Sequence, residues 1–216
     1  MEKEIVLIDK PAGISSFGVV ARVRKKLSLE AGKKVKVGHT GTLDPFATGL
    51  LILLTGKGTK RSNEFLKLDK EYEATICLGK VSNTGDIEGE ITERTVEKVP
   101  ELAEVKQAVK EFEGEITQKV PQFSAVKING ERAYKLARKG VEVEMPKRQV
   151  TIYSIEILRY EWPELEIRCK VSSGTYIRAL GEDIGERLGV GGYLTSLRRT
   201  QVGKYRVEEA EKLEKE

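Results

Sequence analysis

The pattern of apolar and polar residues near the N-terminus predicts a strand, a turn and a helix. The short apolar run "EIVLI" at residues 4–8 is typical of a buried strand. Pro11 and Gly13 then turn the chain. Ser15 or Ser16 can cap the helix that follows. Apolar side chains of that helix recur on one face at helical spacing: Val19, Val20, Val23 and Leu27.

Two strands and a second helix are predicted in the next part of the chain. The run "LLILLTG" at residues 50–56 begins with five apolar residues, as expected of a buried strand. In "EYEATICLG" at residues 71–79, every second residue is apolar, which is typical of a half-buried strand. A helix is expected from Glu101 to Phe112. The side chains expected to face inward are Tyr72, Ala74, Ile76 and Leu78 in the second strand, and Leu102, Val105, Val109 and Phe112 in the helix.

The second half of the chain continues with single helices between strands. We expect a short helix from Arg132 to Lys139, strands at residues 150–158 and 164–172, and a helix at residues 175–189. Because the helices do not alternate regularly with the strands, the pattern favours the α+β class over a doubly wound parallel sheet. The apolar face of the last helix would carry Ile177, Leu180, Ile184 and Leu188.

The segment "GHTGTLDPFATG", residues 38–49, holds the only histidine of the chain, His39, and places Asp44 between Leu43 and Pro45. Its glycines and proline predict a loop, and loops on a rigid scaffold often carry binding and catalytic groups. Proline disfavours helical backbone at the preceding residue, so Asp44 should be extended. Its carboxylate can support a turn or cap a helix. Alternatively, since it is ionised at neutral pH, it can act as a nucleophile without a base.

Several classes of protein are excluded by the composition. The longest apolar run, Leu50 to Leu54, is far shorter than the roughly 20 residues that span a bilayer, and the N-terminus does not resemble a signal peptide. His39 lacks an accompanying serine or cysteine nucleophile motif, so it does not indicate a triad. Cys77 and Cys169 have no CxxC spacing, which argues against zinc. We therefore expect a cytoplasmic protein without a metal or a membrane segment.

The charges are unevenly distributed. Seven basic residues and one acid, Glu30, lie between Arg22 and Lys36, whereas ten acids and four bases lie between Asp86 and Glu115. A basic face opposite an acidic one suits a polyanionic partner such as nucleic acid. Charge-rich surfaces can equally serve solubility or heat tolerance, so charge alone leaves both interpretations open.

Long stretches of the sequence resemble the TruB family of tRNA pseudouridine synthases. The similar segments are "IDKPAGISSFGVVARVRKKL", "KVGHTGTLDPFATGLLILLTGKGTK", "KEYEATICLGKVSNTGDIEG", "PQFSAVKINGERAYKLARKGVEV" and "VSSGTYIRALGEDIGERLGVGGYLTSLRRTQVGKY". They follow the family's order and spacing over nearly the whole chain. The resemblance implies an α+β fold with a mixed, largely antiparallel sheet, flanking helices and a central RNA-binding cleft.

The resemblance also implies a mechanism. Asp44, in the G-T-L-D-P motif, would be the nucleophile that attacks the target uridine, at either the base or the ribose C1′. The glycosidic bond would break, the uracil would turn, and its C5 would bond to C1′. No atom enters or leaves the product, so no cofactor is expected. The target lies in a folded RNA loop and must be flipped out at a cost of a few kcal/mol.

The resemblance assigns further roles in the site. Tyr72 would stack on the flipped uracil, and Arg178 would pair with Asp44 and keep it ionised and oriented. Taken without the resemblance, Tyr72 could be an ordinary strand residue and Arg178 a solvated helix charge. The remaining expected substrate contacts are Tyr176 lining the site, His39 near the target, Leu197 closing the pocket, and Lys10 and Lys60 in the cleft or on the RNA backbone.

The expected domain organisation is a single catalytic domain, residues 1–216. An insertion at about residues 120–150 would clamp the RNA stem-loop, and a short charged helix would occupy residues 208–216. Family members usually continue into a PUA-type RNA-binding module, which we expect this chain to lack. That argues against guide-RNA particles. The basic residues of the insertion are Lys127, Arg132, Lys135, Arg138, Lys139, Lys147 and Arg148.

The function implied is isomerisation of uridine-55 in the T loop of tRNA by a monomeric enzyme. The alternative is a non-catalytic RNA-binding module or tRNA-folding chaperone that uses the same basic cleft. Asp44 distinguishes the two, because a pure binder needs no carboxylate aimed at an anionic ligand. A glycoside hydrolase would need two carboxylates facing the scissile bond, and nothing pairs Glu182 or Asp183 with Asp44.

Overall fold

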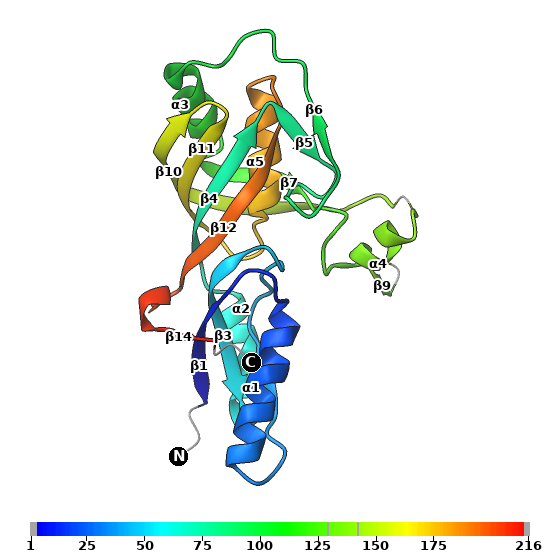
Figure 1. The fold of residues 1–216 in the computed structure, drawn as a ribbon, viewed down its shortest axis with the longest axis vertical. Coiled ribbons are helices and arrows are strands. Elements are labelled where there is room, and N and C mark those ends of the chain that lie inside the picture. Colours follow the sequence, from blue (N-terminus) through cyan, green and yellow to red (C-terminus); the bar gives the residue numbers. More distant parts are fainter. Residues whose placement is uncertain (1–3, 129, 142, 214–216) are drawn as a thin grey trace. The chain divides into compact units, whose positions relative to one another are not determined.

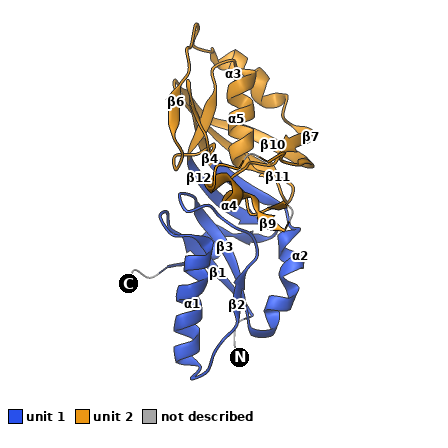
Figure 2. Ribbon diagram, turned by 90° about the vertical axis from the view of Figure 1, so that its right-hand side faces the viewer, with its two compact units in different colours: residues 1–73, 196–216 blue, residues 74–195 orange. Residues whose placement is uncertain are grey.

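The structure is a computed structural model that describes residues 4–128, 130–141 and 143–213. The chain divides into two compact units (Figure 2). Unit 1 comprises Met1–Glu73 and Ser196–Glu216, and unit 2 comprises Ala74–Thr195. Two strands contribute residues to both units: β4, Lys70–Leu78, and β12, Gly192–Val202. The two units thus share two strands, and the single catalytic domain expected from the sequence stays a prediction.

Unit 1 is built on the strand order β14-β1-β3-β12 (Figure 1). The strand β1 pairs antiparallel with β3 over its full length, from Ile5 opposite Leu54 to Lys10 opposite Gly49. The pairs of β1 with β14 and of β3 with β12 are parallel, and β2 pairs antiparallel with β3. The bounds are β1 Ile5–Lys10, β2 Val37–His39, β3 Thr48–Thr55, β13 Tyr205–Arg206 and β14 Glu211–Lys212.

The helix α1, Ser16–Glu30, packs against β2 in unit 1. Its N-cap is Ser15, whose hydroxyl accepts a hydrogen bond from the Gly18 N–H at 3.0 Å. Three of the four predicted apolar positions are buried, which confirms the predicted face of the helix. These are Val19, Val20 and Val23, while Leu27 is half-buried. The other helical elements of unit 1 are η1 Gly56–Arg61, α2 Ser62–Leu66 and η2 Val207–Glu209.

Of the charged helix expected at residues 208–216, only residues 208 and 209 are helical, in the 3-10 helix η2, and the expectation is wrong for residues 210–213. The chain there forms the strand β14, and residues 214–216 lie outside the described residues. Val207, 6% exposed, belongs to the core cluster of unit 1, and Ala210 packs against that cluster. Packing at these positions and backbone pairing with the edge of β1 outweigh the local helix preference of the Glu/Lys-rich sequence.

Unit 2 contains a second stretch of sheet, in the order β12-β4-β11-β10-β7. Along β4 the side chains alternate between buried and half-buried, with Ala74, Ile76 and Leu78 inside, as predicted. The mixed, largely antiparallel α+β fold is thereby confirmed. The strand bounds in this unit are β5 Lys80–Ser82, β6 Ile91–Glu93, β7 Gly114–Lys119, β10 Lys147–Glu161 and β11 Glu164–Val171.

Two helices of unit 2, α3 and α5, contact each other. The helix α5, Ile177–Arg187, buries Ile177, Leu180 and Ile184, as predicted. The helix α3, Leu102–Lys110, is shorter than the predicted one. Leu102 is 45% exposed, so its predicted inward orientation is wrong. Residue 102 is the first residue of the helix, and the buried residues of α3 all lie further along it. No helix in the described ranges is both long and apolar enough to cross a membrane.

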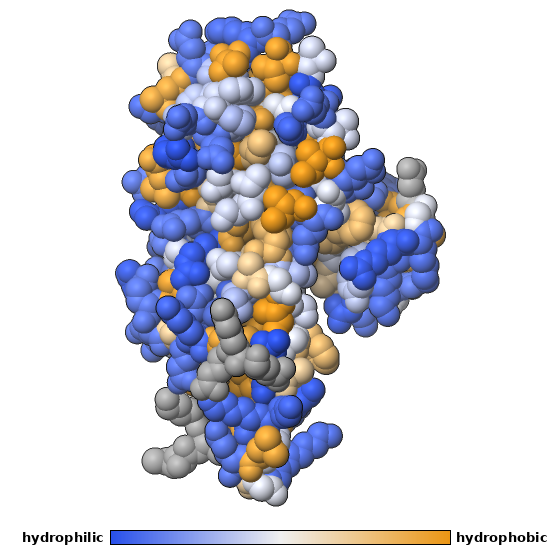
Figure 3. All heavy atoms as spheres, in the orientation of Figure 1, coloured by the Kyte–Doolittle hydropathy of each residue, from blue (hydrophilic) through white to orange (hydrophobic). Residues whose placement is uncertain are grey.

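The insertion between β7 and β10 has a small core of its own. Its elements are β8 Lys127–Ile128, β9 Glu131–Arg132 and α4 Ala133–Arg138, so the short helix predicted here is confirmed. Figure 3 shows that the surface around α4 is mostly hydrophilic. The buried members of the small core are Val120, Ala133 and Met145, and Tyr176 of unit 2 packs against them with Val126, Ile128 and Val143.

Candidate functional site

Asp44 lies in the loop between β2 and β3, among residues that are anchored in the core of unit 1. Leu43 and Phe46 are 3% and 9% exposed, whereas Asp44 and Pro45 are half-buried. The apolar neighbours thus hold the loop to the unit while the carboxylate keeps access to its surface.

Hydrogen bonds fix the peptide groups on both sides of Asp44. The hydroxyl of Ser16, in the first turn of α1, accepts from the Leu43 N–H at 2.8 Å and donates to the Leu43 carbonyl at 2.9 Å. On the other side, the Pro45 carbonyl accepts from the Gly13 N–H at 2.9 Å. Because both neighbouring residues are held, the backbone that directs the carboxylate is set before any substrate binds.

Lys10, expected to contact the cleft or the RNA, lies fully buried at 0% exposure. Its ammonium group donates to the carbonyl oxygens of Ile14 at 2.7 Å, Pro11 at 2.9 Å and Pro45 at 3.1 Å. The last of these bonds joins β1 to the loop that carries Asp44. A side chain with no exposed surface cannot reach a phosphate in this conformation, so the structure gives Lys10 the task of positioning the loop.

Arg199 is a second buried cation at this loop, and it is not among the residues predicted from the sequence. It is 3% exposed and donates to the carbonyls of Leu50 at 2.7 Å and Gly41 at 3.2 Å. Its backbone lies so close to Gly49 (φ +99°) that a Cβ at Gly49 would come within 2.3 Å of the Arg199 carbonyl oxygen. Strand alternation could have found Arg199, because it shares a face of β12 with the buried Leu197.

The other expected site residues of unit 1 differ in their surroundings. His39 is half-buried in β2, and its Nδ1 accepts from the Gly41 N–H at 3.4 Å. Tyr72 on β4 and Leu197 on β12 are 8% and 6% exposed. Lys60 is exposed near the end of η1. The Asp44 loop precedes β3 and η1 follows it, so the length of this strand, roughly 20 Å, separates Lys60 from the loop. The structure does not bring Lys60 to Asp44.

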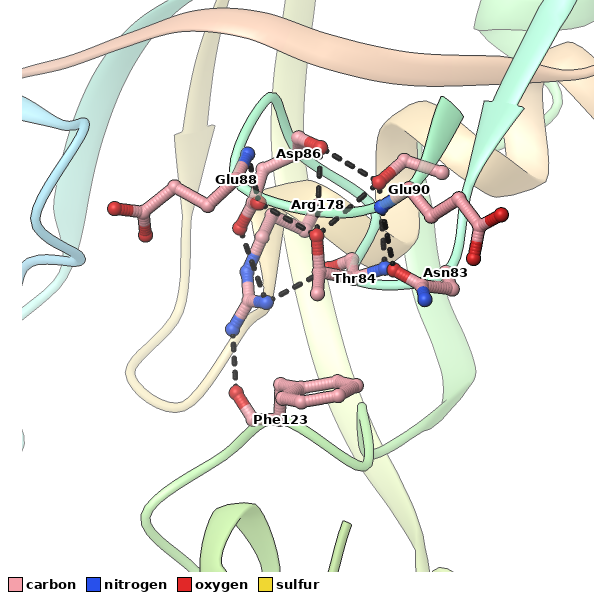
Figure 4. Close-up of polar contacts among 8 residues, drawn as sticks. Asn83, Thr84, Asp86, Glu88, Glu90, Phe123 and Arg178 are labelled. Atoms are coloured by element: carbon pink, nitrogen blue, oxygen red, sulfur yellow. Dashed lines mark hydrogen bonds and ion pairs between the residues drawn. The ribbon is translucent and has the colours of Figure 1, made fainter. Parts of the chain in front are cut away.

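In unit 2, Arg178 is held by a network of buried and half-buried groups (Figure 4). The residue is 5% exposed, and its guanidinium donates to the carbonyls of Thr84 and Phe123, both at 2.8 Å. It also forms an ion pair with Asp86 at 3.3 Å. Three fixed partners leave the planar guanidinium little rotational freedom, which a lysine at this position could not reproduce.

Asp86, 2% exposed, is itself held by the loop that carries it. One of its carboxylate oxygens accepts from the Thr84 hydroxyl at 2.7 Å and from the Glu88 N–H at 3.0 Å. Burial raises the pKa of the neighbouring Glu182 to about 7, and the charge of Asp183 adds to this rise. The carboxyl group of Glu182 packs against Gly85, where a Cβ would lie 3.0 Å from the Glu182 Cδ. The turn from residue 82 to residue 88 therefore meets α5 through buried polar contacts.

Tyr176, the N-cap of α5, is held by a side chain that is also not among the residues predicted from the sequence. The amide of Gln118 on β7 donates to the Tyr176 carbonyl at 3.0 Å and accepts from the Tyr176 N–H at 2.9 Å. Gln118 is 1% exposed. A buried amide with both hydrogen-bonding groups satisfied is a strong positional constraint. No sequence signal distinguishes Gln118 from the other polar residues of β7.

The site residues thus fall into two groups. Asp44, His39 and Lys10 are joined by one loop and its anchors in unit 1, and Tyr176 and Arg178 begin α5 in unit 2. The pairing of Arg178 with Asp44 stays a prediction. Among the described residues, no three His, Cys, Asp or Glu side chains are grouped so that they could hold a metal ion.

Known proteins resemble the chain over most of its length. Residues 24–177 match the family model described as TruB family pseudouridylate synthase (N terminal domain), and residues 178–215 match that described as tRNA pseudouridylate synthase B C-terminal domain. The curated protein named tRNA pseudouridine synthase B from Phocaeicola vulgatus is 48% identical over 211 residues, which cover 96% of this chain and 89% of that protein. The protein of the same name from Aquifex aeolicus is 47% identical over 211 residues, with 97% and 71% covered.

Solved structures share the fold. A chain described under "Crystal Structure of a Cbf5-Nop10-Gar1 Complex" matches with a TM-score of 0.74 and 35% identity, covering 97% of this chain and 52% of that one. A chain described under "Structure of H/ACA RNP bound to a substrate RNA containing 2'-deoxyuridine" matches with a TM-score of 0.70 and 32% identity, covering 96% and 50%. The present chain spans about half the length of these solved chains.

Proposed function

Since the chain belongs to the TruB family of pseudouridylate synthases, we propose that it converts a uridine of tRNA to pseudouridine, and that this uridine is position 55 in the T loop. The observation that carries the proposal is the loop around Asp44. Buried partners fix the residues on both sides of this half-buried carboxylate. A loop that only bound RNA would have no use for a rigidly presented negative charge.

The proposed reaction exchanges one bond for another within the nucleotide. The ionised Asp44 attacks the flipped uridine at the base or at the ribose C1′, and the bond between N1 and C1′ breaks. The uracil turns, its C5 bonds to C1′, and the proton on C5 is lost to solvent while N1 gains one. The product has the same atoms as the substrate, so the reaction needs no redox partner.

The remaining residues would position the uridine and the nucleophile. Arg178 is proposed to pair with Asp44 in the complex, with its orientation already set by Thr84, Phe123 and Asp86. Tyr72 stacks on the uracil, which offsets part of the few kcal/mol that flipping costs. Tyr176 and Leu197 would line and close the pocket, His39 would contact the RNA near the target, and Lys60 would meet the RNA backbone away from it.

The proposed partner is tRNA alone. The insertion presents cationic side chains on a mostly hydrophilic surface, which suits the phosphate backbone of the T stem (Figure 3). We propose a monomeric, cytoplasmic enzyme that acts without a guide RNA. Curated relatives named for action on tRNA cover the chain at 47–48% identity, which favours this over the guide-RNA assemblies named for the solved chains at 35% and 32%.

The test is release of tritium from tRNA labelled at uridine C5. The wild-type protein should release it, and Asp44→Asn should lose release by at least about a thousandfold while tRNA affinity stays within about threefold. Asp183→Asn, which changes an exposed aspartate of α5, is the matched control and should stay active. Release that survives Asp44→Asn would remove Asp44 from its role. Tight binding without release by the wild-type protein would support the alternative of an RNA-binding module or chaperone.

A further inference from the structure

The C-terminal end of α1 and the turn after it carry a concentrated positive charge. Arg24 and Lys25 lie in the last turns of the helix, and Lys33 and Lys34 follow in the turn toward β2. We call these four residues the α1 basic patch. The nearest acid along the sequence is the single Glu30.

The patch surrounds a shallow, open depression in unit 1. The depression has a volume of about 680 Å³. Figure 3 shows a largely hydrophilic surface over this end of α1, at the bottom of the view. The residues that line the depression are the four of the patch together with Ala21, Ser28, Leu29 and Gly32.

Within residues 4–128, 130–141 and 143–213, no ion pair balances the positive charge of the patch. In the described ranges, no carboxylate lies within 4.0 Å of the charged nitrogens of any patch residue. Surface arginines of unit 2 contrast with this, because Arg94 pairs with Glu186 at 2.7 Å and Arg159 with Glu164 at 2.7 Å. Repulsion among four neighbouring cations disfavours the folded state slightly. A bound polyanion would relieve it.

The position of the patch relative to Asp44 follows from α1 itself. Ser16, at the start of the helix, is hydrogen-bonded to Leu43 beside Asp44. The helix then runs for 15 residues to Glu30, or roughly 20 Å at 1.5 Å per residue, and the patch lies at that far end. An RNA whose uridine is seated at Asp44 would have to extend about 20 Å along unit 1 to reach it.

We propose that the α1 basic patch is an auxiliary docking site for the phosphate backbone of tRNA outside the arm that is modified. The inference rests on the proposed function and adds a second region of contact to it. Lysine and arginine bind phosphates by charge, and such contacts fix register and add affinity without reading sequence. The depression has one exposed apolar side chain, Leu29, at its rim, which is too little apolar area to anchor a protein partner.

The experiment compares full-length tRNA with an isolated T-arm stem-loop. In the variant Lys25→Glu/Lys33→Glu/Lys34→Glu, affinity for full-length tRNA should fall about tenfold or more at low salt. The slope of log affinity against log salt should become shallower by about 2, since each lost phosphate contact removes roughly 0.7 to 0.9. Affinity for the stem-loop, and tritium release from it, should stay within twofold of wild type.

The matched control is Lys106→Glu/Lys110→Glu/Lys170→Glu, which makes the same charge change at three exposed lysines of unit 2. This control should leave the ratio of the affinity for full-length tRNA to the affinity for the stem-loop unchanged. An equal loss for stem-loop and full-length tRNA in the patch variant, an equal effect of the control, or no effect on either RNA would overturn the proposal. Tritium release by the wild-type protein from the stem-loop tests the proposed function separately, because it does not involve the patch.

Discussion

Two buried cations, Lys10 and Arg199, hold the loop that presents Asp44. A charged side chain in the interior is unfavourable unless its hydrogen bonds are satisfied. Here backbone carbonyls satisfy them, three for Lys10 and at least two for Arg199. Removing either side chain would take one donor away from each of these carbonyls, at roughly 1–3 kcal/mol for each buried group left unsatisfied. The Pro45 carbonyl would keep the Gly13 N–H. Because losing these hydrogen bonds would destabilise the protein, the loop is held in one conformation.

A single carboxyl group, that of Glu182, should make the stability of the protein depend on pH. The pKa raised to about 7 by burial, from an ordinary 4.5, means that the folded protein retains a proton that the unfolded chain releases. The contribution to stability is full below about pH 4.5 and is lost as pH rises through 7. The variant Glu182→Gln has no ionisable carboxyl group at this position, so it keeps this contribution to stability as pH rises. We expect the melting temperature of this variant, minus that of wild type, to rise between pH 5 and pH 8. A constant difference in thermal melts across that range would contradict the assignment.

The sequence points to single candidate residues where a motif surrounds them. Asp44 and His39 stand out because glycine, proline and unusual residue types are concentrated in one loop. Lys10 could be identified but not interpreted, since a lysine beside a proline gives no sign of being buried. Arg199 and Gln118 act through contacts with residues far away in the chain, which no local pattern reveals.

Among the elements, β7 and α5 are joined through Gln118, and this predicts an effect on catalysis. Gln118→Met keeps the volume of the side chain and removes both hydrogen bonds to Tyr176. Arg178 lies two residues further on, so its guanidinium should shift. Because small displacements of catalytic groups are costly, we expect the single-turnover rate to fall about tenfold to a hundredfold, with tRNA affinity within threefold.

The matched control for this prediction lies on the neighbouring strand. Gln149 of β10 donates its amide to the Thr117 hydroxyl at 2.9 Å and is exposed. Gln149→Met should leave the single-turnover rate unchanged. A rate loss in Gln118→Met that merely parallels lower thermal stability, and that disappears at lower temperature, would reduce Gln118 to a structural role.

Elements with regularly spaced apolar residues were predicted well, and elements whose secondary structure depends on distant partners were not. The alternation along β4 and the apolar face of α5 reflect burial that the sequence itself encodes. The C-terminal segment carries Glu and Lys residues that favour a helix, yet it forms β14 because β1 offers an unpaired edge. The strand pairing that overrides the helix preference is made with residues 8 and 9, about two hundred positions away.

For the molecule as a whole, we expect tRNA binding to weaken steeply with salt. Neutralising three cations of the insertion, in Lys127→Gln/Lys135→Gln/Arg138→Gln, should make the salt slope shallower by about 2. The loss should be the same for full-length tRNA and for the T-arm stem-loop, because the insertion would grip the modified arm itself. Fluorescence anisotropy over a range of salt concentrations measures both slopes. A flat response in the wild-type protein between low and physiological salt would count against the clamp.

The order in which unit 1 acquires its strands has a consequence for synthesis on the ribosome. Thr48 and Arg198 pair in the sheet but are 150 residues apart in the chain. At roughly 5–20 residues per second, the N-terminal strands wait on the order of 10 s for this neighbour. During that interval the part of the β3 edge at Thr48 and Gly49 is open to wrong partners, and the nascent Asp44 loop lacks the guanidinium of Arg199. Asp44 therefore takes up its fixed position only after residue 199 has been synthesised.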